Sequence, residues 1–186
     1  MEYELIRSDR RTIAAQIKDG RLIVRAPRRA SEREIRLFLD GNADRIEKYL
    51  EKSREREAAK AGVRRLTDAE LYALKKRAEE VIPARVRRYA PLVGVTYGRI
   101  TIRRMKTRWG SCSAKGDLTF NSLLMLAPDE VVDSVVVHEL CHRRVMDHSR
   151  AFYKEVLRVF PDYRRHNKWL KDNGDLLTAS AERTKK

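Results

Sequence analysis

The sequence is poor in the residues that define several classes of protein. It contains 2 cysteines, 8 glycines and 5 prolines in 186 residues. Two cysteines cannot form a disulfide framework, so we expect a reducing compartment, with the cytoplasm as the default location. The scarcity of glycine and proline excludes collagen-like and low-complexity chains. Hydrophobic residues still make up 42% of the chain, which is enough to form a buried core.

Long apolar runs are missing as well. The longest ones, Leu123 to Pro128 and Val135 to Val137, fall far short of the roughly 18 residues that a membrane-spanning helix needs. The segment from Met1 to Arg11 is charged throughout and has no apolar core of signal-peptide length. We therefore expect no membrane segment and no export signal.

Positive charge is abundant and unevenly distributed. The chain has 42 Lys and Arg against 27 Asp and Glu, a formal net charge of +15. Over half of this excess lies in residues 61–110, which carry 13 basic and 4 acidic side chains. A basic surface attracts phosphates without reading a base sequence. A solvated basic face is the simpler interpretation; if the charge is functional, Arg103, Arg104 and Lys106 are the candidate nucleic-acid contacts.

The N-terminal part reads as a hairpin followed by a helix. Apolar runs at 12–17 and 21–24 flank Asp19-Gly20, a pair that is typical of β-hairpins. Ser31 to Glu34 has the pattern of a capping box, which starts a helix. We expect three regions, namely a hairpin-and-helix unit over 1–62, a metal-binding domain over 63–177 and a frayed tail over 178–186.

The second part alternates between helical and strand-like patterns. A capping box at Thr67 to Glu70 predicts a helix that ends near Gly94. The remaining expected elements are strands over 95–105 and 117–125, a helix from Pro128 to about Arg144, a helix from Ser149, and a short helix over 163–171 closed by Asn173-Gly174. Helices and short strands in this arrangement predict an α+β fold.

The sharpest chemical signal is the run His138-Glu139-Leu140-Cys141-His142. On a helix, His138 and His142 lie one turn apart on the same face, so two imidazoles can hold one metal ion. Glu139 lies one step round and can reach a water on that metal without binding the metal itself. This is the H-E-x-x-H arrangement of zinc peptidases, in which zinc activates the water and the carboxylate takes its proton.

A catalytic zinc ion also needs a third protein ligand. His148 is the leading candidate, and it requires the chain to turn between Val145 and Ser149, with Asp147 or Ser149 as the next N-cap. Glu155, on the following helix, is the alternative. Residue spacing alone does not decide between these two ligands.

Several sequence blocks together resemble the YgjP-like metallopeptidase domain, a family related to the SprT-like and WLM zinc peptidases. These blocks are Arg108-Trp109-Gly110-Ser111-Cys112, Leu118-Thr119-Phe120-Asn121, His138 to His142, His148-Ser149 with Phe152, and Trp169-Leu170. The resemblance implies a zincin-like domain, with a small, mostly antiparallel sheet packed on the metal-binding helix. It also implies one zinc ion held by His138, His142 and His148, with Glu139 as the catalytic acid and base.

Other residues near these motifs receive simpler interpretations. Trp109 is expected in the core, and Cys141 is expected to be a buried free thiol. Cys112 is not expected to bind the metal, because a thiolate would close a catalytic site. Tyr153, Tyr163, His166 and nearby arginines are alternatives for stabilising an oxyanion. By analogy with zincins, the strand over 118–124 is a candidate edge for binding an extended peptide.

The sequence therefore predicts a zinc-dependent metallopeptidase that cleaves a protein or peptide. A nucleic-acid-associated protease and a non-catalytic metal-binding module are the alternatives. The presence of Glu139 argues against the last one, because a purely structural metal site does not need that carboxylate.

Overall fold

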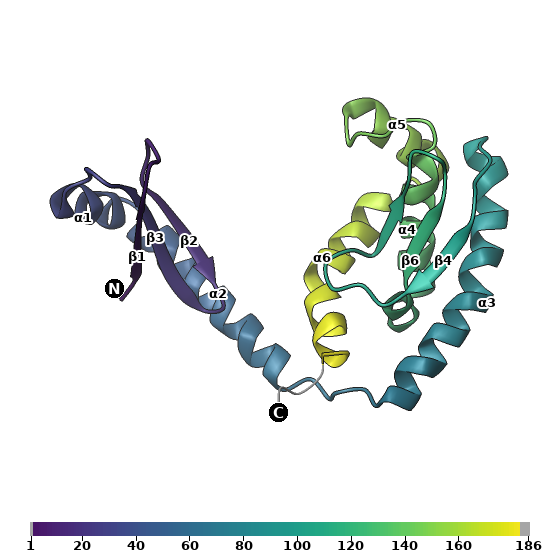
Figure 1. The fold of residues 1–186 in the computed structure, drawn as a ribbon, viewed down its shortest axis with the longest axis horizontal. Helices are drawn as coiled ribbons and strands as arrows, with labels where there is room; N and C mark the ends of the chain where they lie inside the picture. Colours follow the sequence, from purple (N-terminus) through teal and green to yellow (C-terminus); the bar gives the residue numbers. More distant parts are fainter. Residues whose placement is uncertain (1, 183–186) are drawn as a thin grey trace. The chain divides into compact units, whose positions relative to one another are not determined.

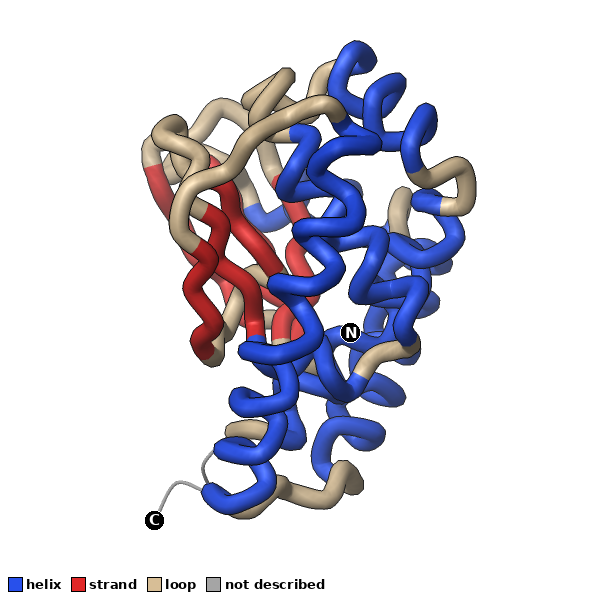
Figure 2. Tube along the Cα trace, turned by 90° about the vertical axis from the view of Figure 1, so that its right-hand side faces the viewer, coloured by secondary structure: helices blue, strands red, loops and turns tan. Residues whose placement is uncertain are grey.

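The computed structural model describes residues 2–182 and divides the chain between Val63 and Arg64 into two compact units. Figure 1 follows the elements of each unit along the chain. The strands are short and the helices are long (Figure 2). Among the described helices, none combines the length and the apolar character needed to cross a membrane.

The first unit is a small sheet with two helices. Its strands are β1 (Glu4–Ser8), β2 (Ala14–Lys18) and β3 (Arg21–Pro27), and its helices are α1 (Glu32–Asp40) and α2 (Ala43–Ala61). The strand order is β1-β3-β2; β1 is parallel to β3, and β2 is antiparallel to it. The core of this unit joins alternate residues of β3 to apolar residues of both helices.

Local signals explain the connections in this unit. Asp19 and Gly20 have φ angles of 51° and 73°, which suit the tight turn of a right-twisted hairpin. Both halves of the predicted capping box form between Ser31 and Glu34. The helical region is interrupted at Gly41, because α1 ends at Asp40 and α2 begins at Ala43.

The second unit is a mixed α+β structure. Its elements are α3 (Asp68–Val93), β4 (Ile100–Arg103), β5 (Gly110–Cys112), β6 (Leu118–Asn121), the 3-10 helix η1 (Ser122–Leu126), α4 (Asp129–Cys141), α5 (Arg150–Val159) and α6 (Tyr163–Ser180). The α+β class is confirmed. The sheet is mixed instead of mostly antiparallel, since β4 is parallel to β6 and β5 is antiparallel to it.

The strand order β4-β6-β5 changes one expectation. The segment over 118–124 is not an edge strand. Its first part is β6, at the centre of the sheet, and the rest begins the 3-10 helix. The short strand β5 lies at the edge, because β6 already pairs on both sides.

Helix α3 is not ended by the two prolines within it. The predicted capping box between Thr67 and Glu70 is present, and the helix continues through Pro83 and Pro91 to Val93. Gly94 follows as a left-handed C-cap with φ 76°, a conformation that glycine adopts without a steric penalty. The predicted end near Gly94 is therefore confirmed.

The C-terminal helix corrects two expectations. Helix α6 does not close at Asn173-Gly174 but continues to Ser180, so residues 178–180 are helical and not a frayed tail. Two contacts hold this end, because the backbone N–H of Leu66 donates to Ser180 O at 2.7 Å and the Arg104 side chain donates to Ala181 O at 3.1 Å. Residues 183–186 of the expected tail lie outside the described residues.

Candidate metal centre

Helix α4 places the candidate ligands at the end of a buried element. Pro128 is its N-cap, and two acidic residues in the first turn suit the positive end of the helix dipole. Buried residues occur on all sides of this helix, from Val131 to Cys141, which is the pattern of a helix enclosed by its own domain. The helix ends at Cys141, so His138 lies in its last turn and His142 is its C-cap.

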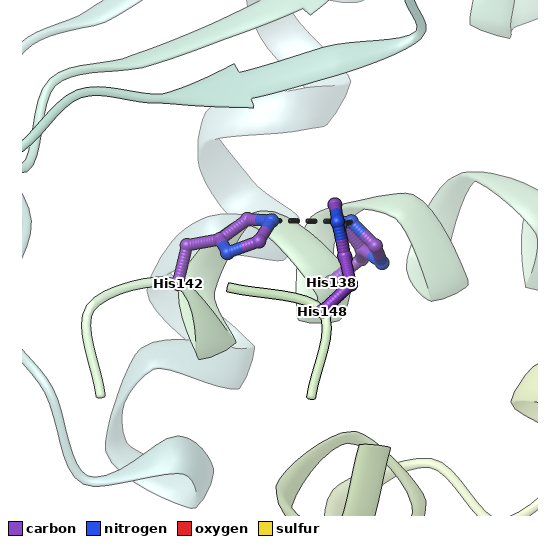
Figure 3. A group of neighbouring side chains, drawn as sticks. All are labelled: His138, His142 and His148. Atoms are coloured by element: carbon purple, nitrogen blue, oxygen red, sulfur yellow. Dashed lines mark hydrogen bonds between the residues drawn. The ribbon is translucent and has the colours of Figure 1, made fainter. Parts of the chain in front are cut away.

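Three histidine rings converge at this end of α4 (Figure 3). The Nε2 atom of His138 lies 3.3 Å from Nε2 of His142 and 3.0 Å from Nε2 of His148. All candidate ligand atoms of the three residues lie within 4.8 Å of one another. Two nitrogen ligands of a tetrahedral zinc ion, each about 2.05 Å from the metal, lie roughly 3.3 Å apart. The two separations measured from His138 therefore suit a metal ion of this size.

A tight turn carries His148 back to the end of the helix. The N–H groups of Arg144 and Val145 both donate to Cys141 O, which closes the last turn of α4. Asp147 then accepts a hydrogen bond from the N–H of Ser149 at 3.1 Å, and Ser149 is the N-cap of α5. The expected turn is therefore confirmed, and of the two expected N-cap candidates Ser149 takes this position.

The other ring nitrogens fix how two of the histidines face the cluster. His142 Nδ1 lies 3.2 Å from Val145 O, and a carbonyl oxygen only accepts, so Nδ1 carries the proton and Nε2 carries the lone pair. His138 Nδ1 lies 2.8 Å from the hydroxyl of Tyr163 on α6. Partners of this kind orient histidines that bind metal ions.

Burial favours the neutral form of His138 and His142. It lowers the pKa of His138 to about 3, and the neighbouring His142 and His148 lower it further. The pKa of His142 is also lowered, again chiefly by burial. A neutral imidazole with a free Nε2 lone pair is the form that binds a metal ion.

Glu139 is buried beside the cluster and faces strand β5. Only 5% of its surface is exposed, and burial raises the pKa of its carboxyl to about 8, against the opposing charge of Arg108. A Cβ atom on Gly110 would lie 2.5 Å from Glu139 Oε1 and 2.6 Å from its Cγ. The absence of a side chain at Gly110 therefore makes room for the carboxylate.

Comparison with known proteins assigns a family to this arrangement. The family model described as YgjP-like, metallopeptidase domain, matches residues 68–173, which is more than half of the chain. The chain belongs to the YgjP-like metallopeptidase family. The expected family and the expected metallopeptidase activity are thus confirmed. Membership implies a divalent metal ion and a peptide or protein substrate.

Two solved structures are also similar to part of this YgjP-like chain. The metallopeptidase zymogen abylysin of Pyrococcus abyssi is 21% identical, with a TM-score of 0.45; the match covers 50% of this chain and 94% of that one. The metallopeptidase zymogen jannalysin of Methanocaldococcus jannaschii is 22% identical, with a TM-score of 0.44, over 51% and 96% of the two chains. No curated protein matches the chain.

A cavity of about 550 Å³ opens onto the histidines of this YgjP-like domain. Residues 107–112 form one wall, and His138, Glu139, His142, His148 and Tyr163 contribute to the rest. Trp109 is partly buried and packs against the core, in line with the expectation, but it also lines this cavity. A Cβ atom on Gly174 would lie 3.0 Å from its ring. The Arg-Trp-Gly-Ser-Cys block was recognisable in the sequence, but its place in the wall was not, because it depends on contacts with α4 and α6.

The two cysteines have different surroundings. Cys141 is a fully buried free thiol, as expected. Cys112 is also free and lines the cavity, but it is not part of the group of candidate metal ligands. Burial raises the pKa of the Cys112 thiol, and the nearby carboxylate of Glu139 adds to this effect.

The remaining candidates from the sequence differ in their distance from the cluster. Glu155, the alternative third ligand, pairs with Arg158 at 3.1 Å and Arg144 at 3.5 Å, and the candidate ligand group does not include it. His166 makes an edge-to-face contact with Phe160. Of the candidates for stabilising an oxyanion, Tyr163 lines the cavity, whereas Tyr153 and His166 are not among its described lining residues.

One of the three candidate nucleic-acid contacts, Arg104, has a structural partner. Arg103, Arg104 and Lys106 are all exposed. Arg104 donates to Ala181 O at the end of α6, so this side chain also holds a helix terminus. Arg103 and Lys106 are the more accessible pair for a polyanion.

Proposed function

We propose that this chain is a zinc-dependent peptidase of the HExxH type, with one zinc ion per chain. The observation that carries the proposal is the convergence of three imidazole nitrogens next to one buried carboxylate, at the floor of a single cavity. A ligand set of three histidines leaves one coordination position open for chemistry in a tetrahedral site.

In this proposal His138, His142 and His148 hold the metal ion. When bound there, zinc supplies Lewis-acid activation of a water molecule and polarises the substrate carbonyl. Tyr163 keeps the His138 ring in place through its hydroxyl, and the carbonyl of Val145 does the same for His142. These contacts orient the His138 and His142 rings before the metal ion binds.

Glu139 moves the proton. Its carboxylate accepts a proton from the attacking water and donates it to the leaving amine, which is the general base and acid role in peptide hydrolysis. Burial without a metal ion holds the pKa of Glu139 at about 8. The positive charge of a bound ion lowers that pKa and so favours the carboxylate form before the attack.

Strand β5 aligns the substrate. It is one of the two edge strands of the sheet, and Gly110, Ser111 and Cys112 line the cavity beside Glu139. An extended peptide adds to such an edge through main-chain hydrogen bonds, which give affinity with little choice of sequence. We propose that the scissile peptide lies antiparallel or parallel to β5, with its carbonyl toward the three histidines.

The Glu139→Gln variant tests the catalytic proposal. It removes the base and leaves the three histidines, so we expect full zinc content, an unchanged fold and a loss of peptide cleavage. The substrate comes from a peptide-library cleavage screen with the parent chain, and zinc is measured by elemental analysis after purification without added metal. The matched control is His138→Ala, which we expect to lose both zinc and activity.

Three outcomes would contradict the proposal. Loss of zinc in Glu139→Gln would make this residue a ligand or a structural group. Unchanged cleavage in Glu139→Gln would mean that Glu139 is not the catalytic base. A parent chain that binds zinc but cleaves no peptide of the library would favour the non-catalytic metal-binding module.

A nucleic-acid-associated protease is the second proposal. The exposed side chains of Arg103 and Lys106, in the most basic part of the chain, support it. The test compares the rate of cleavage of one protein substrate with and without DNA or RNA at near-physiological salt. An unchanged rate would leave a peptidase with a basic surface, because a chain of this charge binds polyanions in any case.

We also keep the cytoplasm as the proposed location. Cys112 and Cys141 are both free, and two unpaired thiols suit a reducing compartment. Fractionation of cells that express the chain, followed by detection with an antibody, tests this location.

A further inference from the structure

A second cavity lies entirely within the first unit. It has a volume of about 670 Å³ and lies between strand β2 and helix α2. Its floor is apolar and includes Ile13, Ala15, Ile17, Phe38 and Ile46. Four of these side chains are only partly buried against the core of the unit, so apolar surface is left for another molecule to cover. We call this cavity the β2 groove.

One wall of the β2 groove is a free sheet edge. The order β1-β3-β2 leaves β2 with a single partner among the described strands, so the backbone groups on its other side have no ladder. Ala14 lines the groove together with Ala15, although successive side chains of a strand point to opposite faces. The groove therefore reaches around the edge of β2 and gives access to its unpaired N–H and C=O groups.

The opposite wall is a positively charged face of α2. Arg45, Tyr49 and Lys52 follow one another at helical spacing along this wall, and the Arg45 guanidinium lies 5.9 Å from the centre of the Tyr49 ring. The five acidic residues of α2 do not line the groove; they are Asp44, Glu47, Glu51, Glu55 and Glu57. The helix as a whole is thus mixed in charge, whereas its groove face carries cations only.

We propose that the β2 groove is a docking site for an extended, acidic polypeptide segment. The segment pairs with the edge of β2, alternate apolar side chains cover the floor, and its carboxylates meet Arg45 and Lys52. The free edge of β2 supports the main-chain pairing, and the cationic groove face of α2 supports a partner with carboxylates. A nucleic acid fits less well, because Phe38 and Tyr49 are the two aromatic side chains among the lining residues, and they offer few rings for base stacking.

The first experiment measures binding to the full-length chain carrying Glu139→Gln, so that the probe is not cleaved. The probe is a fluorescein-labelled peptide of alternating valine and glutamate, about eight residues long and so longer than a typical strand. We expect saturable binding by fluorescence anisotropy, and we expect it to persist with a metal chelator. Persistence with the chelator separates this site from the proposed metal centre, so failure of one leaves the other intact.

Charge reversal locates the site. Arg45→Glu combined with Lys52→Glu should weaken peptide binding at least about tenfold, because like charges then face each other. The matched control is Arg36→Glu, an exposed arginine of α1 outside the groove, which should change the affinity less than about twofold. Circular dichroism melting confirms that each variant folds. Equal binding by the double variant and the parent chain would overturn the proposal.

A second measurement tests the sheet edge and needs no substitution. Hydrogen–deuterium exchange should slow in β2 when the peptide binds, whereas β1, the other edge strand of the same sheet, should not change. Protection of β1 instead of β2, or no binding of the peptide at all, would overturn the proposal. Binding of a labelled thymidine oligonucleotide that is lost in the double variant, with no peptide binding, would assign the groove to nucleic acid instead.

Discussion

The Gly110→Ala substitution should displace the Glu139 carboxylate without touching the histidines. The added methyl carbon would lie 2.5 Å from Oε1, 2.6 Å from Cγ and 2.8 Å from Cδ of Glu139. Gly110 is not among the described glycines with positive φ, so alanine accepts its backbone conformation. Helix α4 is buried on all sides and cannot retreat, so the carboxylate must move by about 0.9 Å to reach an ordinary contact distance of 3.4 Å.

A shift of this size is large for a group that transfers a proton. A misplacement of about 1 Å costs on the order of 100-fold in rate, and overpacking a core destabilises a protein by roughly 1–3 kcal/mol. We therefore expect kcat to fall about 100-fold, with full zinc content and a lower but still cooperative unfolding transition. The assay combines kcat on a peptide that the parent chain cleaves, elemental analysis of zinc, and urea unfolding.

Gly62→Ala is the matched control. A Cβ atom there would lie 3.7 Å from the nearest carbonyl oxygens, which is an ordinary contact, and φ is −80°. We expect this variant to keep the parent rate. Full activity in Gly110→Ala would refute the reasoning, because it would mean that the position of the carboxylate does not limit the rate. Zinc loss in step with the activity would refute it as well.

Three further predictions concern the ligands and the packing around them. His148→Ala should weaken zinc binding more than about 100-fold, because loss of a metal ligand costs more than the 10-fold to 100-fold loss typical of residues that only contact a ligand. Glu155→Ala should leave zinc binding unchanged. A competition titration measures both affinities, and the reverse order would make Glu155 the third ligand. Tyr163→Phe should lower zinc affinity or kcat about 10-fold to 100-fold, since it removes the hydroxyl that lies 2.8 Å from the first histidine of α4; an unchanged affinity and rate would leave that contact without a role. Asp133→Ala should destabilise the chain by about 1–3 kcal/mol in urea, because it removes one of the two carboxylates that pair with Arg85 and the acceptor of the Tyr89 hydroxyl. Lys168→Ala breaks an exposed pair and should change stability by less than about 0.5 kcal/mol; equal effects would contradict this contrast.

The features that could be predicted from the sequence are those determined by residues only a few positions apart in the chain. The capping boxes at Ser31 and Thr67 satisfy helix N-termini through residues three positions away, and both form. The H-E-x-x-H spacing places His138 and His142 together by helix geometry alone. The turn before Ser149 follows from residues that favour turns over helix interiors.

The features that could not be predicted depend on contacts between distant segments. Parallel strands are not joined by a tight turn, so no local sequence signal indicates the pairing of β1 with β3. Residues 4–8 were therefore not predicted as a strand. The pattern of Asn173-Gly174 is typical of a helix end, yet α6 continues past it. The ring of Trp109 lies close to Gly174, in the space that a larger side chain at this position would need. The central place of β6 likewise depends on which strands pair with it, a choice that its own residues do not reveal.

The three histidines belong to parts of the chain that differ in local stability. His142 closes the buried helix α4 and is 8% exposed, whereas His148 is exposed in the turn before α5. Segments with little buried surface open at a lower free-energy cost than the core does. We therefore expect the turn to open while α4 stays folded, so that His148 dissociates first and rebinds last. The rate of metal exchange should then follow the dynamics of residues 143–149 and not the global unfolding rate.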